Sequence, residues 1–421
     1  MRNRGSSILL LNRRLRQNRE IIGSHPCNRG SNSRGGRHFF DDRKDLQQLT
    51  PILIMICYLI IMRNKIISEI LEDIVNRLGE ESRFLEGSTL IISGGAGFLG
   101  SYFLGVIHLL NEKFLAKPCH VISIDNYITG TKESFVGDVY GEHIKRVEAD
   151  IRTPFSVPEP VVDYIIHAAG LASPVYYNKY PLETIESTIH GAKNLLELAR
   201  QKKPKSFLLF SSSEIYGDPH PASIPTPEHY KGNVSCTGPR ACYDESKRLA
   251  ETLCLTYHQL YDIPLKIVRP FNVYGPGMKP SDHRVVPDFI TRAIAGAPLR
   301  VHGSGNQTRT FCFISDAVVG FFKVLLSQKN GEVYNVGTDR EEINMAKLAH
   351  LVAEYFDNQI EINLVDYSEA YPADEPRRRC PDITKISREL DFHPTWDLRS
   401  GLKKTVEWYR DILPFDWAPD L

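Results

Sequence analysis

The sequence predicts an α/β fold, in which a doubly wound parallel sheet is followed by a smaller C-terminal α/β domain. Two observations support this prediction: short apolar segments alternate with helical segments over residues 63–270, and the first expected strand runs into a glycine-rich turn. Such alternation is typical of parallel strands joined by right-handed crossovers. A helix is expected after each of the first four strands, and the expected strands are Thr89–Ser93, His120–Asp125, Tyr164–His167, Ser206–Ser211 and Leu265–Arg269.

Three regions can be distinguished along the chain. Residues 1–62 include a stretch rich in Arg, Asn, Gly and Ser, which indicates a disordered or over-extended start, with Met55 and Met62 as alternative first residues. The strand–helix alternation occupies residues 63–270, and longer loops with scattered helices follow in residues 271–421. An amphipathic helix is expected to lead into the alternating region, because apolar residues recur at helical spacing: Ile66, Ile67, Ile70, Leu71 and Ile74.

The composition is that of an ordinary globular protein, with 42% hydrophobic residues and 51 basic side chains against 51 acidic ones. This balance gives no indication of a nucleic-acid partner. The 8 cysteines are scattered without a CxxC pair or a Cys/His ligand spacing, so neither a metal site nor a disulfide framework is expected. We expect buried thiols in a reducing compartment.

An apolar run covers residues 52–62, which is short compared with the roughly 20 residues of a membrane-spanning helix. We therefore expect a cytoplasmic protein. A membrane anchor through residues 51–62 is the alternative, because arginines flank the run.

A strand–turn–helix–strand unit near residue 90 predicts a dinucleotide site. The turn is Gly94-Gly95-Ala96-Gly97-Phe98-Leu99-Gly100, whose glycines allow a tight turn, the approach of backbone amides to a pyrophosphate and close helix–strand packing. The next strand ends in Asp125, followed by Asn126; a carboxylate there accepts hydrogen bonds from ribose hydroxyls but repels a 2′-phosphate. NAD on a Rossmann-type sheet is therefore expected. Asp150 and Ile151 are candidates to flank the adenine, with a loop cap as the alternative for Asp150.

Two groups of residues are candidates for catalysis. Tyr243 and Lys247 are four residues apart, which places both side chains on one face of a helix. A tyrosine titrates at about 10 when unperturbed, so a nearby ammonium group and an oxidised nicotinamide would help it act as a base. The polar segment Ser211–Asp218 follows an apolar strand, where catalytic groups of open α/β sheets gather. The structural alternatives are an exposed helical pair and a serine-capped turn with a solvated Glu214.

These segments resemble the extended short-chain dehydrogenase/reductase family, as does Arg269–Pro276. Within that family, residues 87–410 are similar to the UDP-glucuronate decarboxylases in four segments: Ser211–Asp218, Gly238–Arg248, Gly303–Arg309 and Arg377–Ile383. The resemblance implies NAD-dependent decarboxylation of UDP-glucuronate to UDP-xylose through a 4-keto intermediate, with the hydride returned to the sugar. It also implies an NAD-binding domain over residues 63–270, mainly nucleotide-sugar binding over residues 271–421, and a homodimer formed through two helices per subunit.

The resemblance further assigns roles to single residues. Tyr243, assisted by Lys247, removes the proton of the sugar 4-hydroxyl, while Ser212 and Ser213 orient the sugar and Glu214 handles a proton. The related 4,6-dehydratases carry an Asp-Glu pair where this chain has Ser213-Glu214, and a serine cannot protonate a departing hydroxyl. Guanidinium groups suit pyrophosphate and carboxylate, and the expected substrate contacts are Tyr177, Asn272, Arg309 and Arg379.

Other functions stay open from the sequence. A nucleotide-sugar 4-epimerase needs only the hydride cycle at Tyr243, whereas Ser213 speaks against a 4,6-dehydratase. A catalytically inactive NAD-binding regulator is a further alternative, against which the intact Tyr243, Lys247 and Glu214 speak. The segment Val175–Lys179 departs from the decarboxylase pattern, so a different acidic sugar is also an alternative.

Overall fold

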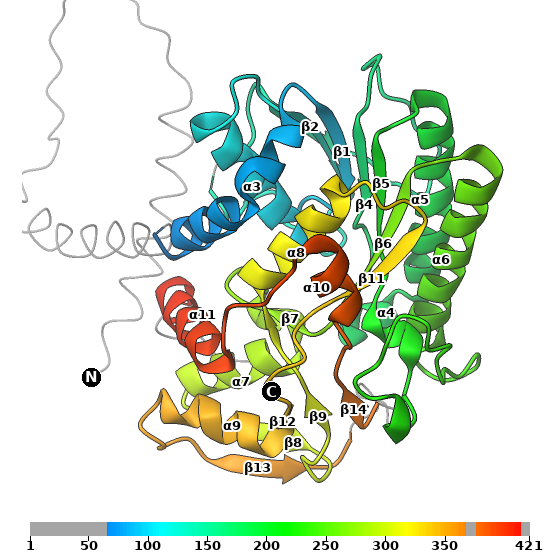
Figure 1. Ribbon diagram of the computed structural model, residues 1–421. Helices are drawn as coiled ribbons and strands as arrows, with labels where there is room; N and C mark the ends of the chain where they lie inside the picture. Colours follow the sequence, from blue (N-terminus) through cyan, green and yellow to red (C-terminus); the bar gives the residue numbers. More distant parts are fainter. Residues whose placement is uncertain (1–64, 138, 368–375, 414–421) are drawn as a thin grey trace, which may run out of the picture. The chain divides into compact units, whose positions relative to one another are not determined.

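The computed structural model describes residues 65–137, 139–367 and 376–413, and its main sheet has seven strands, all paired in parallel (Figure 1). The strands are β1 (Thr89–Ser93), β2 (His120–Asp125), β3 (Ile144–Glu148), β4 (Tyr164–His167), β5 (Ser206–Phe210), β6 (Leu265–Pro270) and β11 (Glu332–Val336). Their order is β11-β6-β5-β4-β1-β2-β3, which reverses between β1 and β4. The predicted doubly wound sheet is therefore confirmed, and ligands of such sheets bind outside the strand ends at this reversal.

The central strands are apolar on both faces because both faces are covered. In β1, Leu90 and Ile92 belong to one hydrophobic core, whereas Ile91 belongs to the other. All five residues of β5 are also buried. Side chains alternate along a strand, so a strand between two layers of helices reads as a continuous apolar run.

Helices cover both faces of the sheet. On one face lie α3 (Phe98–Lys113) and α8 (Ile314–Leu326), where the ring centroids of Phe103 and Phe322 are 4.5 Å apart. On the other face, α5 (Pro181–Lys202) and α6 (Ala241–Tyr261) lie side by side (Figure 1).

The structure corrects several details of the predicted elements. All five predicted strands are present, with β5 ending earlier, at Phe210, and β6 later, at Pro270. The helix predicted after β2 is wrong: the described residues between β2 and β3 form turns and loops, and Gly130, Gly137 and Gly141 favour such turns. Strand β3 has no apolar run that would predict it, because four of its five residues are exposed at the sheet edge.

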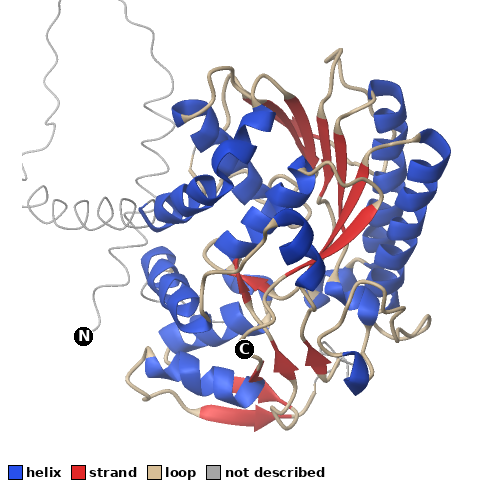
Figure 2. Cartoon of the chain, in the orientation of Figure 1, coloured by secondary structure: helices blue, strands red, loops and turns tan. Residues whose placement is uncertain are grey.

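The residues after 270 form three small sheets and return one strand, β11, to the main sheet (Figure 2). The additional strands are β7 (Val273–Tyr274), β8 (Leu299–His302), β9 (Thr308–Arg309), β10 (Cys312–Phe313), β12 (Ile343–Asn344), β13 (Ile362–Val365) and β14 (Arg378–Arg379). The additional helices are α4 (Pro174–Lys179), α7 (Val285–Ile294), α9 (Met345–Glu354), α10 (Thr384–Leu390) and α11 (Leu398–Ile412), with 3₁₀ helices η1 (Gly79–Leu85), η2 (Ser213–Tyr216), η3 (Pro221–Ser223) and η4 (Pro280–Asp282). Because β11 pairs with β6, the second half contributes to both parts of the fold, and the boundary at residue 270 stays a prediction.

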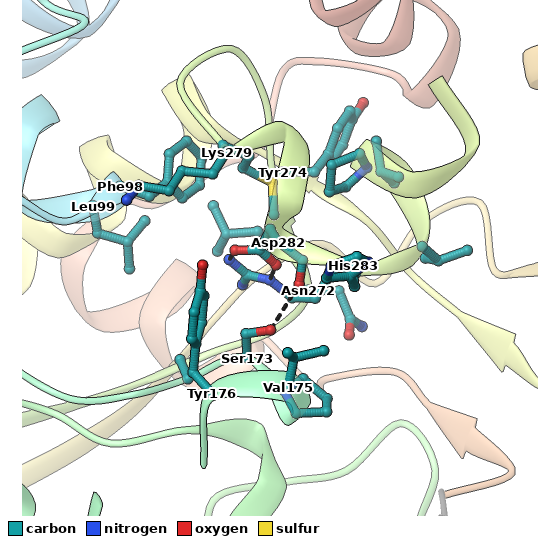
Figure 3. A pocket seen from close by; sticks show the side chains of 18 of the residues that line it. Phe98, Leu99, Ser173, Val175, Tyr176, Asn272, Tyr274, Lys279, Asp282 and His283 are labelled. Atoms are coloured by element: carbon teal, nitrogen blue, oxygen red, sulfur yellow. Dashed lines mark hydrogen bonds and ion pairs between the residues drawn. The ribbon is translucent and has the colours of Figure 1, made fainter. Parts of the chain in front are cut away.

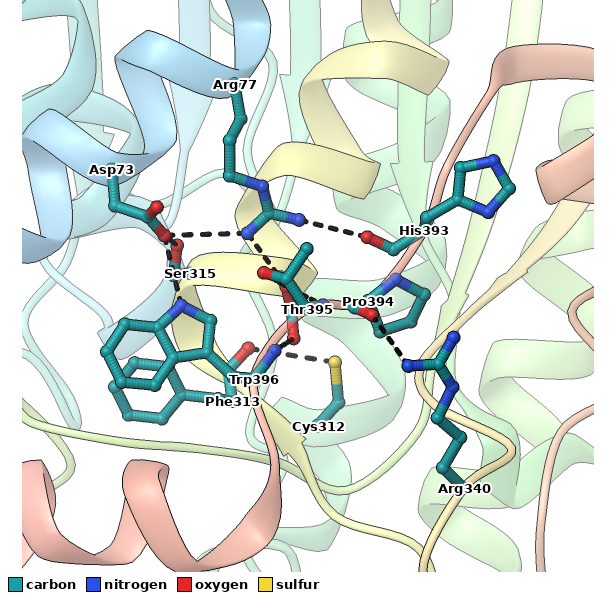
Figure 4. A network of polar contacts seen from close by, with 11 residues as sticks. Asp73, Arg77, Cys312, Phe313, Ser315, Arg340, His393, Pro394, Thr395 and Trp396 are labelled. Carbon is teal, nitrogen blue, oxygen red and sulfur yellow. Dashed lines mark hydrogen bonds and ion pairs between the residues drawn. The ribbon is translucent and has the colours of Figure 1, made fainter.

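The predicted lead-in helix is confirmed over the described residues 65–78, and its five predicted apolar residues are all buried. A polar network fixes this helix to α8 and to the segment before α11 (Figure 4). Arg77 pairs with the buried carboxylate of Asp316 at 2.8 Å and donates to the His393 carbonyl at 3.2 Å. Asp73 accepts a hydrogen bond from the indole nitrogen of Trp396 at 3.1 Å. The helix thereby joins segments far apart in the sequence.

Within the described ranges, no helix is long and apolar enough to cross a membrane. The predictions for residues 1–62, including the anchor alternative, fall outside these ranges. In the same part of the chain the six cysteines are unpaired, and four of them are buried: Cys119, Cys254, Cys312 and Cys380. No group of three or more His, Cys, Asp or Glu among the described residues could hold a metal ion.

Candidate active site

A cavity of about 1020 Å³ opens beyond the carboxyl ends of the central strands. Its wall joins the glycine-rich turn, the serine turn after β5, the start of α6 and the small sheet of β9 and β14. In Figure 3 the segment from Tyr274 to His283 faces Ser173 and Tyr176, and the Ser173 hydroxyl donates to the Asp282 carbonyl at 2.7 Å. The predicted site residues that line the cavity are Gly94, Gly97, Phe98, Leu99, Gly100, Tyr177, Ser212, Ser213, Glu214, Tyr243, Lys247, Asn272, Arg309 and Arg379.

The glycine-rich turn lies between β1 and α3 and leaves no room for side chains. Gly94 has φ +79°, and a Cβ there would lie 2.6 Å from the backbone nitrogen of Ala169. A Cβ on Gly100 would lie 2.2 Å from the carbonyl oxygen of Gly94. Helix α3 begins after Gly97 without a side-chain cap, so amide groups and the positive end of the helix dipole are offered to a ligand. This cradle fits a pyrophosphate.

Asp125 ends β2 next to this cradle. Its carboxylate accepts hydrogen bonds from the backbone nitrogens of Ala96 at 2.9 Å and of Tyr127 at 2.8 Å, one on each oxygen. Burial raises the pKa of Asp125, and these N–H groups partly offset that rise. Each carboxylate oxygen has a second lone pair, so the group fits the ribose hydroxyls of NAD.

A second cavity of about 70 Å³ adjoins the first at the glycine-rich turn. Asn126 and Ile151 line it, as does Arg152, which the sequence did not single out. Asp150 lines neither cavity. Its carboxylate accepts hydrogen bonds from the backbone and guanidinium nitrogens of Arg152, at 2.7 to 3.0 Å, so Asp150 caps the turn.

Tyr243 and Lys247 are both buried on α6, which contradicts the exposed-pair alternative. Lys247 Nζ donates to the carbonyl of Phe210 at 2.8 Å and lies 5.8 Å from the centroid of the Tyr243 ring. Burial raises the pKa of Tyr243 to about 12 although a hydrogen bond with Ser212 lowers it, and burial lowers the pKa of Lys247 to about 8. Tyr243 therefore needs additional positive charge nearby to act as a base. The Tyr177 ring stacks on Tyr243, with centroids 5.4 Å apart.

The serine turn after β5 serves both local structure and the site. Ser212 caps η2, because its hydroxyl oxygen accepts a hydrogen bond from the Glu214 backbone nitrogen at 3.2 Å. The same hydroxyl is hydrogen-bonded to Tyr243. The capping alternative is thus right for Ser212, but the Glu214 side chain is only 16% exposed and is not solvated.

Glu214 is surrounded by guanidinium groups. One of its carboxylate oxygens accepts hydrogen bonds from both Arg240 and Arg379, the latter at 2.8 Å. Arg379 also donates to the Asn272 side-chain oxygen at 3.2 Å. Burial raises the pKa of Glu214, but the charges of Arg240, Arg379 and Arg309 outweigh burial and hold that pKa below its ordinary value. Glu214 is therefore ionised at neutral pH.

Pairing of two short strands brings Arg309 and Arg379 together. β9 and β14 are parallel, with Arg309 opposite Arg379 in register. Arg309 also donates to the Thr308 carbonyl at 2.8 Å. Side chains of opposite residues share one face of a sheet, so two guanidinium groups border the cavity next to Glu214, as recognition of an acidic substrate requires.

Residues 90–337 match the model of the NAD dependent epimerase/dehydratase family. The chain belongs to this family. It is 39% identical over 330 residues to UDP-glucuronic acid decarboxylase 5 of Arabidopsis thaliana, covering 78% of this chain and 92% of the relative. It is 38% identical over 326 residues to UDP-glucuronic acid decarboxylase 1 of Xenopus tropicalis, covering 77% and 72%. A solved UDP-glucuronic acid 4-epimerase of Bacillus cereus, in complex with UDP-glucuronic acid and NAD, is 25% identical with a TM-score of 0.64, covering 77% of this chain and all of that one.

The match to the NAD dependent epimerase/dehydratase family begins within β1 and ends after β11, so it includes the main sheet. Family membership agrees with the glycine-rich cradle and with Asp125, both of which fit a dinucleotide.

Among the charged groups of this family member's site that sequence reasoning missed are Arg240, Asp244 and Arg284. Arg240 stands three residues before Tyr243 in a segment that carried the resemblance, which was the available signal. Asp244 pairs with Arg240, and burial together with the Glu214 charge raises the pKa of Asp244 to about 7. Arg284 lines the cavity and pairs with Asp282, but in the sequence it is one charged loop residue among many.

Proposed function

We propose that this protein is a UDP-glucuronate decarboxylase that forms UDP-xylose with a bound NAD regenerated in each cycle. One observation carries the proposal: Tyr243 and the guanidinium groups around Glu214 line the same cavity. A uronic acid needs both features, a base for its 4-hydroxyl and cations for its carboxylate. The names of the plant and frog relatives support the same substrate.

The side chains of the cavity suit each step of this reaction. When bound, NAD supplies a hydride acceptor for C4 of the sugar and returns the hydride at the end of the cycle. Tyr243 takes the proton of the 4-hydroxyl, and its hydrogen bond with Ser212 and the Lys247 charge stabilise the phenolate. Arg309 and Arg379 supply the charges that hold the diphosphate and the carboxylate.

The 4-ketone formed in this way is β to the sugar carboxylate. The bond between C5 and the carboxylate carbon breaks, its electron pair moves toward the ketone, and carbon dioxide leaves. C5 then takes up a proton, and reduction at C4 completes the pentose. Glu214, which the arginines keep ionised, is suited to accept and relay a proton.

Dehydration would need a different group at the same place. A 4,6-dehydratase must protonate the hydroxyl that leaves the sugar. The Ser213 hydroxyl is not an acid, and the lowered pKa of Glu214 makes that carboxyl a poor proton donor at neutral pH. Decarboxylation needs no such donor.

The test is the product formed from UDP-glucuronate labelled with ¹³C at the carboxylate. Purified protein is expected to release labelled carbon dioxide and to form UDP-xylose, both followed by NMR, and denatured protein is expected to yield NAD. A sugar epimer formed without carbon dioxide would replace this proposal with the epimerase alternative. Retained NAD without any turnover would favour the inactive regulator.

We also infer a homodimer through α5 and α6. Four apolar side chains on these adjacent helices are exposed, by 39% to 68%: Leu182, Ile185, Leu249 and Leu260. Exposed apolar residues along two neighbouring helices suit an interface between two copies of the chain. Light scattering should give the mass of two chains, and Leu249→Glu should shift it toward one. A monomeric wild-type protein would contradict this inference.

A further inference from the structure

The two arginines that share an oxygen of Glu214 are held in different ways. Arg240 is the residue before α6, and its guanidinium bonds Glu214 while its Nε lies 3.5 Å from a carboxylate oxygen of Asp244. Asp244 is one helical turn further along, so the helix itself fixes the distance between this acid and Arg240. Arg240 is thereby held between the carboxyl group of Asp244 on α6 and that of Glu214 on η2.

Arg379 is less committed to Glu214. It lies on the two-residue strand β14 and divides its guanidinium between Glu214 and the amide oxygen of Asn272. Its Nε is buried but has no hydrogen-bond partner among the described residues. A buried donor without a partner is costly, so the present contacts of Arg379 leave part of its guanidinium unsatisfied. When Arg379 bonds to a substrate carboxylate, Arg240 is the remaining arginine that bonds the Glu214 carboxylate.

We propose that Arg240, held by Asp244, is a positioning residue that keeps the Glu214 carboxylate ionised and in place while Arg379 is shared with the substrate. The inference rests on the proposed function for the reaction, but its central claim concerns only the state of Glu214. It assigns the two arginines different tasks: Arg240 acts on Glu214, and Arg379 acts on the substrate.

The charges around Glu214 predict the direction in which its pKa changes when Arg240 is replaced. The groups that face it are Arg240 just before α6, Tyr243 and Asp244 from α6, Arg309 from β9 and Arg379 from β14. Burial raises the pKa of Glu214, and the three arginines lower it. Without the Arg240 charge that pKa rises, because an opposite charge in contact favours the ionised carboxylate. An activity that needs ionised Glu214 is lost as the pH falls through this pKa, so the acidic limb of the pH profile moves to higher pH. The Arg240 charge also lowers the pKa of Asp244, so the infrared titration below separates the two carboxyl groups.

The experiment compares pH profiles of kcat and KM for UDP-glucuronate in NAD-loaded wild type, Arg240→Gln and Arg240→Lys. Arg240→Gln should move the acidic limb upward by about one pH unit with little change in KM, and Arg240→Lys should restore part of the shift. Arg379→Gln should mainly raise KM.

Arg248→Gln is the matched control. Arg248 lies on the same helix and donates to the Ile215 carbonyl at 3.0 Å, so it supports the turn beside Glu214 without contacting the carboxylate. The acidic limb of the Arg248→Gln pH profile should lie at the same pH as that of wild type. An unmoved limb in folded Arg240→Gln, or an equal shift in Arg248→Gln, would overturn the proposal.

A second readout needs no substrate. Infrared titration of wild type, with Glu214→Gln as the reference, follows the protonated-carboxyl band of Glu214. In wild type this band should appear only below the pH range in which a glutamate ordinarily titrates. In Arg240→Gln it should appear at higher pH. If wild type releases no carbon dioxide, the proposed function fails while this titration still decides the inference. If neither Arg240 variant folds, Glu214 titrating at or above its ordinary range in wild type would refute it.

Discussion

Replacement of Gly100 by alanine tests the dinucleotide site most directly. Gly100 lies in the first turn of α3, and a Cβ there would be 2.2 Å from the Gly94 carbonyl oxygen and 2.7 Å from the Gly95 Cα. Both obstacles are backbone atoms, so no flexible side chain can turn away. A Cβ contact closer than 3.0 Å essentially never occurs, so the helix and the turn must separate by at least 0.8 Å, the difference between 3.0 and 2.2 Å.

This separation widens the surface on which the pyrophosphate would rest. Forcing an extra methyl group into a packed site costs about 1–3 kcal/mol, which corresponds to roughly 5- to 150-fold in a binding constant. We expect Gly100→Ala to weaken NAD binding within that range, to lower the melting temperature, or to divide the cost between the two.

Calorimetric titration of cofactor-stripped protein with NAD, combined with thermal unfolding, measures both parts of this cost. Gly141→Ala is the control, because a Cβ at Gly141 meets nothing within 4 Å. The control should match wild type in both measurements. If Gly100→Ala also matches wild type in NAD affinity and melting temperature, the close approach of α3 to the glycine-rich turn is wrong.

Three further predictions concern the base, the substrate cations and the lead-in helix. Tyr243→Phe keeps the ring that stacks on Tyr177 but loses the phenol, so carbon dioxide release should fall by about 10²–10⁴-fold while NAD stays bound; undiminished release would place the base elsewhere. Arg379→Gln should weaken the binding of UDP-glucuronate by roughly 10- to 150-fold, which corresponds to the loss of about 1.5–3 kcal/mol for a charged hydrogen bond. It should weaken the binding of UDP-glucose much less. Equal losses of affinity in a binding titration would contradict a carboxylate role. Arg77→Met leaves Asp316, which is 1% exposed, without its cation, so the free energy of unfolding measured in urea should fall by about 3 kcal/mol. Arg83→Met is the control, because Arg83 belongs to an exposed pair with Glu80. It should change the free energy of unfolding by less than about 1 kcal/mol.

Signals within one element predicted much of the fold. Strand β1, its turn and α3 follow from an apolar run, three spaced glycines and helical periodicity, all within residues 89–113. Strand β3 could not be found in this way, because an edge strand with four exposed residues buries little and shows no apolar run. The loop between β2 and β3 misled the helix prediction, since alternation alone does not reveal a crossover made of turns.

Taken alone, the sequence determined the features that depend on neighbours in the chain: the glycine-rich turn, Asp125 at a strand end, and Tyr243 and Lys247 one helical turn apart. Only the tertiary structure decided what the charged residues do. Arg379 meets Glu214 across 165 residues, because β14 pairs with β9 beside the cavity. Arg240 became a partner of the same carboxylate because α6 begins beside η2. A guanidinium group looks the same in any sequence, and its role is set by the acid that the fold places against it.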